Sequence, residues 1–292
     1  MSGDMRSTTR PWWRRWWVWA SALLVVALLG LLLMPGSPAV RLLRQDTTWH
    51  AMTQRGVWRI GMDPSFPPFE TLADDGAIVG YDVDLARAMA AQWDMEVELV
   101  AIGFDSLIDA LIAGKVDSVI SALPLDPRLT KDIAYSAPYF EAGLRLAVPQ
   151  ASALAATDPS ALAPDAFDPA ALLDGQTVAV EWGSTGDMIG RRLTREGASL
   201  TLAQYPTPQE AVDALVRGEA DALLVDNVTL REAQGQGAAI VAVGPALESS
   251  PYVIAMPLRA DELHRNVADA LAALQADGTF NQLESAWFGP RE

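Results

Sequence analysis

The sequence predicts an α/β protein built from two similar parts, which follow one hydrophobic N-terminal segment. From residue 57 onward, short apolar runs alternate with helical patterns, as in folds whose parallel strands are connected by helices. A nine-residue near-repeat occurs in both halves of this region, as DALIAGKVD at 109–117 and as DALVRGEAD at 213–221. Residues 16–34 form an uncharged apolar run that is long enough to cross a bilayer as a helix.

The N-terminal segment is predicted to anchor the chain in a membrane. Arg10, Arg14 and Arg15 precede the apolar run and tryptophans cluster at its start, which is typical of a cytoplasmic basic flank followed by an interfacial aromatic belt. We therefore expect residues 1–15 to be a cytoplasmic basic tail and residues 16–36 to be a transmembrane helix. A cleaved signal peptide is the alternative, and both interpretations place the remaining chain outside the cytoplasm.

The elements of the body follow one another as expected for alternating strands and helices. Residues 37–55 are predicted to be a linker that ends in a short amphipathic helix closed by Gly56. The expected strands span 57–62, 97–102, 116–120, 143–148, 178–180, 200–204, 222–225, 240–243 and 252–256. The expected helices span 82–93, 105–113, 187–195, 207–217, 261–275 and 279–287. Between them, residues 151–169 are rich in Ala, Pro and Asp without periodicity, which indicates a surface excursion.

The near-repeat has a structural meaning in both halves. Each copy places a glycine, Gly114 or Gly218, where a helix should end, and a buried strand should follow at once. The helix of the second copy also begins with Thr207-Pro208-Gln209-Glu210, a capping box with proline at the first helical position. Such a repeated module is what two similar α/β lobes would contain.

Composition excludes several classes of function. The net charge is −16, and residues 1–45 carry +5, so the rest of the chain carries −21 and should repel nucleic acid. Without cysteine there is no disulfide, thiolate metal site, cysteine nucleophile or lipid-modified cysteine. The chain has only two histidines, His50 and His264, which are too few for a histidine-rich metal site and leave few candidates for a Ser-His-Asp triad. We expect no catalytic residue, metal or cofactor.

Several sequence blocks, in order, are similar to those of one family. They are WRIGMDPSFPPFE at 58–70, VGYDVDLA at 79–86, FDSLIDAL at 104–111, GKVDSVIS at 114–121, YSAPYF at 135–140, GSTGD at 183–187, and ADGT at 276–279 before WFG at 287–289. Together they cover about residues 56–290, and on them the chain resembles the bacterial extracellular solute-binding proteins of family 3. The resemblance implies the type II periplasmic binding fold, in which two doubly wound α/β lobes are joined by two crossover strands and close on a ligand.

The resemblance also implies how the chain is divided. Lobe one should comprise residues 56–148 and 251–292, and lobe two residues 149–250. The crossovers are expected near Leu146–Val148 and Pro251–Val253. Ligands of open α/β sheets lie beyond the carboxyl ends of the strands. The loops after Met62, Ile120, Val180 and Val225 should therefore face the cleft.

In lobe one, five positions are candidate ligand contacts. Asp63 and Phe66 follow the first strand, where a carboxylate can pair with a cation and an aromatic face can stack on a ligand. The alternative is that Asp63 only opens a turn and Phe66 only plugs a loop. Phe104 resembles a second aromatic wall, with core packing as its alternative. Ser121 and Ala122 end a strand whose backbone in the family binds the ligand amino group.

The carboxylate-binding position departs from the family pattern. Pro124 stands where a hydroxyl is usual, and Leu129 stands where the family has an arginine that grips the ligand α-carboxylate. Arg128 lies one residue earlier, and its long side chain could serve instead. The alternative is that Arg128 is a surface charge and that the ligand is not an ordinary α-amino acid.

In lobe two, four further residues are candidates. Ser184 and Thr185 lie at a predicted helix N-terminus, which suits an anionic oxygen, and Glu181 precedes them as a specificity residue. Asp226 matches the family carboxylate that receives the ligand ammonium, and it can also cap the helix that follows.

These residues predict a solute-binding protein rather than an enzyme. Asp63, Glu181 and Asp226 outweigh Arg128, so we expect a cationic or zwitterionic ligand, with basic amino acids first. The implied partners are this ligand, an ABC transporter permease, and the membrane through the N-terminal helix. Two alternatives remain, a sensing subunit that acts on a separate membrane partner and a dehydratase-type enzyme on the same fold.

Overall fold

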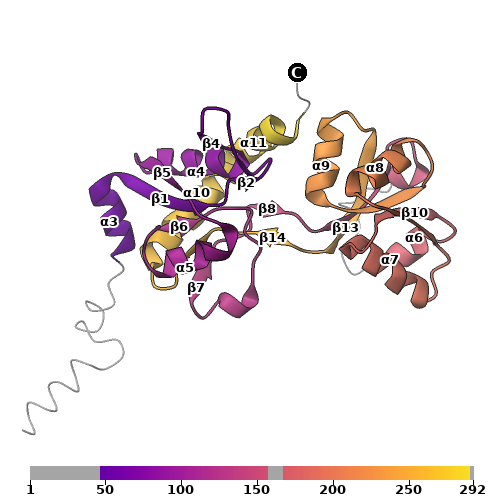
Figure 1. Ribbon diagram of the computed structural model, residues 1–292, viewed down its shortest axis with the longest axis horizontal. Helices are drawn as coiled ribbons and strands as arrows, with labels where there is room; N and C mark the ends of the chain where they lie inside the picture. The colour runs from indigo at the N-terminus through magenta and orange to yellow at the C-terminus, as the bar shows by residue number, and fades with distance from the viewer. Residues whose placement is uncertain (1–46, 157–166, 290–292) are drawn as a thin grey trace, which may run out of the picture. The chain divides into compact units, whose positions relative to one another are not determined.

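The computed structural model describes residues 47–156 and 167–289, which contain two five-stranded sheets (Figure 1). The first sheet has the order β5-β1-β6-β15-β7. Its central strand β1 (Val57–Met62) pairs in parallel with β5 (Glu96–Ala101) and with β6 (Ser118–Val119). Strand β15 (Ala255–Pro257) runs antiparallel between β6 and β7 (Ile133–Tyr135).

The second sheet repeats this arrangement in the order β11-β10-β12-β9-β13. Strand β10 (Thr177–Glu181) pairs in parallel with β11 (Thr201–Tyr205) and with β12 (Ala222–Asp226). Strand β9 (Leu144–Pro149) runs antiparallel to both β12 and β13 (Ile240–Glu248). We call each sheet with its covering helices a lobe, and the predicted mixed α/β fold is confirmed.

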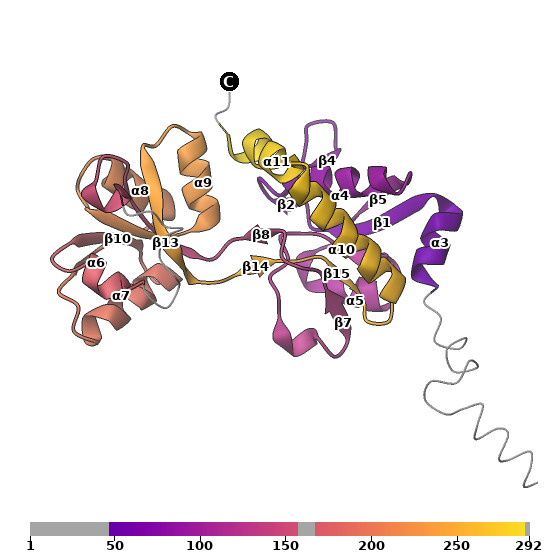
Figure 2. The same ribbon diagram turned by 180° about the vertical axis from the view of Figure 1, so that it is seen from behind.

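Helices pack on both faces of each sheet (Figure 2). In chain order they are α3 (Thr48–Arg55), α4 (Tyr81–Gln92), α5 (Leu107–Ile112), α6 (Pro169–Leu172), α7 (Thr185–Arg195), α8 (Pro208–Val216), α9 (Asn227–Gly235), α10 (Asp261–Ala276) and α11 (Thr279–Phe288). Strand β10 shows how one strand serves two cores, because Val178 and Val180 pack with the α7 residues while Ala179 packs with those of α8. This alternation is the two-residue period of a buried strand.

A small three-stranded sheet lies between β1 and α4 in the chain, in a stretch for which no strand or helix was expected. It contains β2 (Ser65–Phe66), β3 (Glu70–Leu72) and β4 (Ile78–Val79). Gly80 has a φ of 153°, and a Cβ at this position would overlap the carbonyl of Phe69. The missing side chain therefore lets β3 approach the first turn of α4, which brings Glu70 close to Asp82.

The chain passes between the two lobes through a pair of short antiparallel strands, β8 (Phe140–Glu141) and β14 (Pro251–Tyr252), which lie side by side in both views. The carboxylate of Glu141 accepts hydrogen bonds from Gly143 N at 2.8 Å and from Ser250 N at 2.7 Å. It also accepts one from Ser249 Oγ at 2.6 Å. One side chain thus ties the outgoing connection to the returning one.

Two expectations about these crossings were wrong. Leu146–Val148 is not a crossover, because it lies inside β9, between β12 and β13 of the second sheet. The single strand expected at 252–256 is divided, since Tyr252 pairs with β8 whereas Ala255 pairs within the first sheet. The alternation of apolar residues could not reveal this change of partner, because the buried side chains continue through it. The exact lobe boundaries stay a prediction.

Smaller differences occur at other element ends. The helix expected at 105–113 is divided into a 3₁₀ turn, η1 (Phe104–Ser106), and α5, and β13 continues beyond Val243 to Glu248. The excursion at 151–169 contains the turn η3 (Ala153–Ala156) and the start of α6, and its residues 157–166 lie outside the described residues. The basic tail, the transmembrane helix and most of the linker also lie outside them. Among the described helices, none has the length and apolarity needed to cross a membrane.

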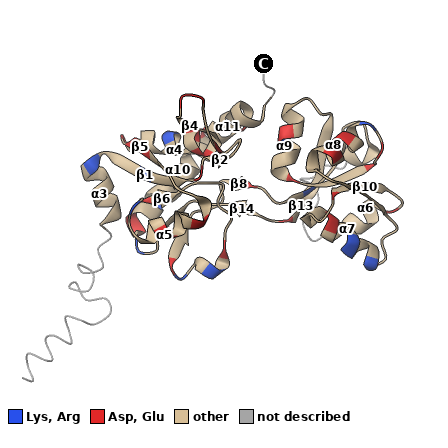
Figure 3. Cartoon of the chain, in the orientation of Figure 1, with Lys and Arg blue, Asp and Glu red and all other residues tan. Residues whose placement is uncertain are grey.

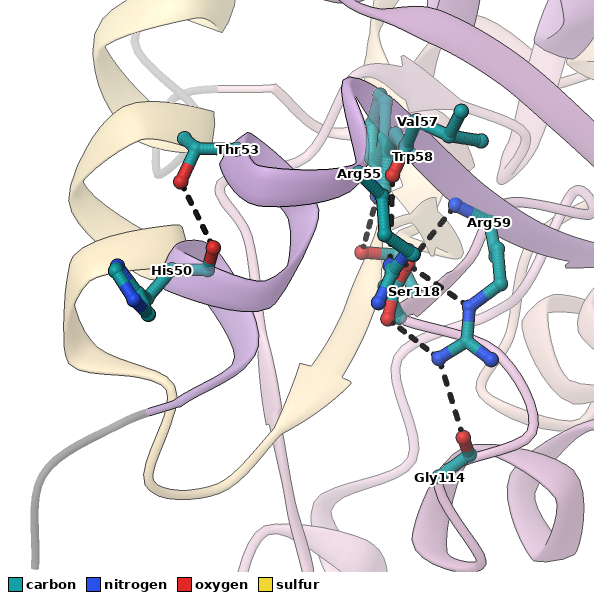
Figure 4. Close-up of polar contacts among 9 residues, drawn as sticks. His50, Thr53, Arg55, Val57, Trp58, Arg59, Gly114 and Ser118 are labelled. Carbon is teal, nitrogen blue, oxygen red and sulfur yellow. Dashed lines mark hydrogen bonds and ion pairs between the residues drawn. The ribbon is translucent and has the colours of Figure 1, made fainter.

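The aspartate that ends each copy of the near-repeat performs the same task in both lobes. Asp117 accepts a hydrogen bond from Arg59 N at 3.0 Å, and Asp221 accepts one from Thr177 N at 2.8 Å, so they hold the starts of β1 and β10. Asp117 has additional partners in the guanidinium groups of Arg55, at 2.6 Å, and Arg59, at 2.8 Å. Figure 4 shows both arginines beside β1, and Arg55 ends α3, so the ion pair fastens this helix to lobe one.

We expect Asp117→Ala to lower the free energy of unfolding by about 2 kcal/mol, because it leaves two partly buried guanidinium groups and one backbone amide without their acceptor. Asp221→Ala is the matched control, since it removes the equivalent backbone bond without an ion pair, and it should cost about 1 kcal/mol. Urea unfolding of both variants measures the difference. Equal losses would contradict a separate contribution of the arginines.

Candidate ligand-binding site

Two cavities lie at the carboxyl ends of the central strands. The smaller one, of about 300 Å³, belongs to lobe one and β14 and is lined by Asp63, Ser65, Phe66, Glu70, Phe104, Ser121, Ala122, Pro124 and Tyr252. The larger one, of about 500 Å³, is lined by residues of both lobes, namely Phe66, Pro67, Ala142, Gly143, Leu144, Thr185, Asp226, Val228, Thr229, Glu232, Glu248, Ser250 and Tyr252. Because Phe66 and Tyr252 line both, the two cavities form one candidate site.

In the smaller cavity, Asp63 connects two ligand-facing segments. Its Oδ2 accepts a hydrogen bond from Phe104 N at 2.9 Å, and its own amide donates to Ser121 Oγ at 2.9 Å. Asp63 is thus more than a turn opener, because it joins the loop after β1 to the turn at η1 and to the end of β6. The second carboxylate oxygen remains available for a ligand that carries a hydrogen-bond donor.

The two predicted aromatic walls are exposed rather than packed in the core. Phe66 is 44% exposed and Phe104 is 45% exposed, and both line the smaller cavity. Phe66 is held from behind by Phe69, whose ring stacks on it with a centroid separation of 5.9 Å and an interplanar angle of 13°. An aromatic face supported in this way can receive a planar or cationic group.

Beneath the smaller cavity lies a buried pair of carboxyl groups. Glu70 is 1% exposed and Asp82 is fully buried, and the charge of Asp82 acts on Glu70. Glu70 Oε1 accepts from Ser121 Oγ at 2.9 Å, and Asp82 Oδ2 accepts from Ala122 N at 2.6 Å and from Tyr139 Oη at 2.9 Å. Burial, followed by the charge of Asp82, raises the pKa of Glu70 to about 10, and burial raises the pKa of Asp82 to about 6.

In lobe two, two of the predicted residues cap helices at the site. Ser184 Oγ accepts from Asp187 N at 3.2 Å and begins α7, which places Thr185 at the larger cavity. Asp226 begins α9, with its Oδ1 accepting from Thr229 N at 2.8 Å and its Oδ2 from Thr229 Oγ1 at 2.7 Å. Asp226 also lines the larger cavity, so its capping role and a ligand-binding role are compatible.

Three predicted residues, Ser184, Glu181 and Arg128, do not line either cavity. Glu181 ends β10 at the edge of the site, and the neighbouring Trp182 is 70% exposed. The side chain of Arg128 is 88% exposed and forms an ion pair with Asp126 at 2.7 Å in a 3₁₀ turn, η2 (Pro127–Leu129). The one-residue shift from the family position thus coincides with a different partner, because Asp126 captures the guanidinium locally.

The sequence analysis missed three acids and one tyrosine of the lining, Glu70, Glu232, Glu248 and Tyr252. Glu232 lies on α9 four residues after Val228, so both face the larger cavity, but neither was a predicted site residue. Tyr252 lay in a predicted crossover and Glu70 in a quoted block, but nothing local distinguished them from structural residues. Glu248 reaches the cavity only because β13 extends beyond its predicted end.

The charge of the lining is one-sided. Its five acidic residues are Asp63, Glu70, Asp226, Glu232 and Glu248, and no Lys, Arg or His is among the described residues that line the two cavities. Figure 3 shows basic residues on α3, on α7 and in the turn before β7, and none on β8 or β14. The site therefore offers mainly acceptors and negative charge.

The fold and the site define a two-lobed α/β binding protein whose cavities lie at the strand ends. The model of the bacterial extracellular solute-binding proteins, family 3, matches residues 58–290, and the chain belongs to this family.

Individual relatives agree with this assignment. The L-arginine-binding protein of Pseudomonas aeruginosa is 29% identical over 241 residues, which are 79% of this chain and 87% of the relative. The structure of an ancestral cationic amino acid solute binding protein is 28% identical, with a TM-score of 0.59, and the match covers 82% of this chain and 99% of that one. An ancestral cyclohexadienyl dehydratase, 24% identical with a TM-score of 0.65 over 82% of this chain and 95% of that one, shares the fold.

We expect Asp226→Ala to lower the free energy of unfolding by about 1 kcal/mol, because the N-terminus of α9 loses its cap. Asp226→Ser should retain most of the stability, since a serine hydroxyl can accept from Thr229 N. Thermal unfolding without ligand compares the two variants. A serine variant as unstable as the alanine variant would show that the charge of Asp226, and not its capping bond, stabilises the fold.

Proposed function

We propose that this chain captures a small cationic solute between its two lobes, with basic amino acids favoured, for import by an ABC transporter. The observation that carries the proposal is the acidic lining of the two cavities, which no basic residue among their described lining offsets. A ligand enclosed by such walls loses hydration, so it must bring a positive charge of its own.

The proposed roles follow from the geometry of the site. Phe66 and Phe104 would form the aromatic walls for an extended cationic side chain, with Asp63 as its ion-pair partner. On lobe two, Asp226 would receive the ligand ammonium, and Thr185 would close over it. The amide of Ala122 already donates to Asp82, so Ala122 would offer its carbonyl oxygen.

The names of the relatives support the choice of a basic amino acid. The matched proteins named for a ligand include binding proteins for L-arginine, for histidine, and for lysine, arginine and ornithine. A dehydratase role has less support, because its structural likeness is one of fold alone. We therefore favour binding without chemistry.

The proposed cellular setting follows from the family and from the N-terminal sequence. We propose that the binding lobes work outside the cytoplasm and that residues 16–36 keep the chain at the membrane, close to its permease. Ligand binding would stabilise a closed arrangement of the lobes, which a permease can recognise. The tie between Gly143, Glu141 and Ser250 would be the place about which such closure occurs.

We expect calorimetry on the full-length chain to detect binding of L-arginine, L-lysine and L-ornithine, and none of L-glutamate, whose side chain adds a negative charge to an acidic site. Asp226→Ser should weaken L-arginine binding by about 30-fold, the equivalent of about 2 kcal/mol for a lost buried charge partner. Asp168→Ser is the matched control, because Asp168 also caps a helix but lines neither cavity. Binding of glutamate alone would overturn the proposal.

The variant Arg128→Ala tests whether Arg128 binds the ligand carboxylate. Since Arg128 is exposed and paired with Asp126, we expect this variant to bind L-arginine and agmatine, its decarboxylated analogue, as tightly as the unmodified chain does. Both ligands share the guanidinium group, so the comparison isolates the carboxylate. A loss confined to L-arginine would instead show that Arg128 turns into the closed cleft and holds that carboxylate.

A further inference from the structure

The carboxyl pair beneath the smaller cavity has two oxygens that find no donor. Glu70 Oε2 and Asp82 Oδ1 are both buried without a hydrogen-bond partner. The other oxygen of each group is occupied, by Ser121 on Glu70 and by Ala122 and Tyr139 on Asp82. The two groups are neighbours, because Glu70 binds Ser121 and Asp82 binds the amide of the next residue, Ala122.

A proton shared between these neighbouring carboxyl groups would give both unpartnered oxygens a hydrogen bond. Two carboxylates have only acceptors, and placing two negative charges together in a buried site is unfavourable without a compensating cation. The ionisable groups near the pair are Asp63 after β1, Tyr81 of α4, Tyr139 before β8 and Tyr252 of β14. The charges of Arg231 and Glu284 act on the pKa of Tyr81. None of the groups that act on the pair directly is a cation.

We propose that Glu70 and Asp82 share one proton and that this protonated pair positions the ligand-facing end of β6. The proposal depends on the proposed function only for the choice of ligand in its binding test.

The pair acts on the site through two residues. Asp82 fixes the amide of Ala122, whose φ of 43° is a left-handed conformation that residues with a side chain rarely adopt. Glu70 fixes the hydroxyl of Ser121, which in turn accepts from the amide of Asp63. Loss of the shared proton would add a second buried negative charge, separate the carboxyl groups and release both strand-end residues. Glu70 and Asp82 are thus positioning residues.

The direction of the pH dependence follows from the proton count. The folded pair retains a proton that an unfolded glutamic acid releases above its ordinary pKa of about 4.5. The stabilisation by the pair is therefore fully present at acid pH and is lost as the pH rises toward the raised pKa of Glu70, at about 10. Affinity for a ligand that needs the positioned strand end should fall in the same direction.

Amide substitutions distinguish a pair that shares one proton from a pair of two independent carboxylates. In Glu70→Gln, the amide nitrogen can donate permanently to Asp82 while its oxygen still accepts from Ser121. In Asp82→Asn, the amide nitrogen can donate to Glu70 while its oxygen still accepts from Ala122 and Tyr139. In the double variant two amide nitrogens face each other without an acceptor. We expect each single variant to be mild and the double variant to lose more than the sum of both.

The test uses the full-length chain and L-arginine, titrated from about pH 6 to beyond about pH 10, the value to which the pKa of Glu70 is raised. Relative to Glu70→Gln, the unmodified chain should keep its affinity until the pH approaches about 10 and then lose it by up to about tenfold per pH unit, the limit for one linked proton. The comparison cancels any titration of the ligand itself. Asp84→Asn, in the same turn of α4 but outside the pair, should titrate like the unmodified chain.

A second readout needs no ligand and distinguishes failure of this proposal from failure of the proposed function. Infrared spectra at neutral pH should contain a carbonyl band of a protonated carboxylic acid, which Glu70→Gln removes and Asp84→Asn retains. A missing band, or a double amide variant that unfolds at a higher temperature than both single variants, would overturn the shared proton. If L-arginine fails to bind while the band is present, the ligand assignment is wrong and the pair remains.

Discussion

The tie at Glu141 is the constraint on which the two-lobed structure depends. One carboxylate accepts hydrogen bonds from Gly143 on the outgoing connection and from Ser249 and Ser250 on the returning one. The two five-stranded sheets do not pair with each other, and the lobes meet again where Arg231 of α9 forms an ion pair with Glu284 of α11 and where Val228 packs in the core of lobe one. Because both connections pass Glu141, the cavities beside it are lined by residues of both lobes, and a movement of one lobe must change the backbone at this point.

The site then follows from the parallel strands of each lobe. Their carboxyl ends lie at one edge, where Asp63 and Ser121 meet in lobe one and Asp226 begins a helix in lobe two. The acids at the cavity surface and the buried acids beneath it differ in charge. The outer layer of the site holds acids that can meet a cation, whereas the layer beneath holds Glu70 and Asp82, whose burial favours a shared proton. An acidic binding surface is thus supported by a carboxyl pair that carries less charge than its composition suggests.

Much of the candidate site could be located from the sequence, because strand ends and helix starts are local features. Asp63, Phe66, Phe104, Thr185 and Asp226 line the cavities for this reason. Arg128 shows the limit of this approach, since a nearby acid, Asp126, pairs with it and keeps it outside them. Glu70 and Tyr252 show another limit. Their place in the site depends on Gly80 allowing β3 to approach α4 and on β14 pairing with β8, and neither contact leaves a local pattern.

The sequence by itself determined the α/β class, the order of the main strands and helices, the family and the acidity of the body. These properties depend on periodicity, capping and composition, which act over a few residues or over the whole chain. The tertiary structure decided where the chain crosses between lobes, which acids line the cavities, and which carboxyl groups meet beneath them. Such contacts join residues far apart in the chain, and their energies depend on burial and distance, which only the folded arrangement defines.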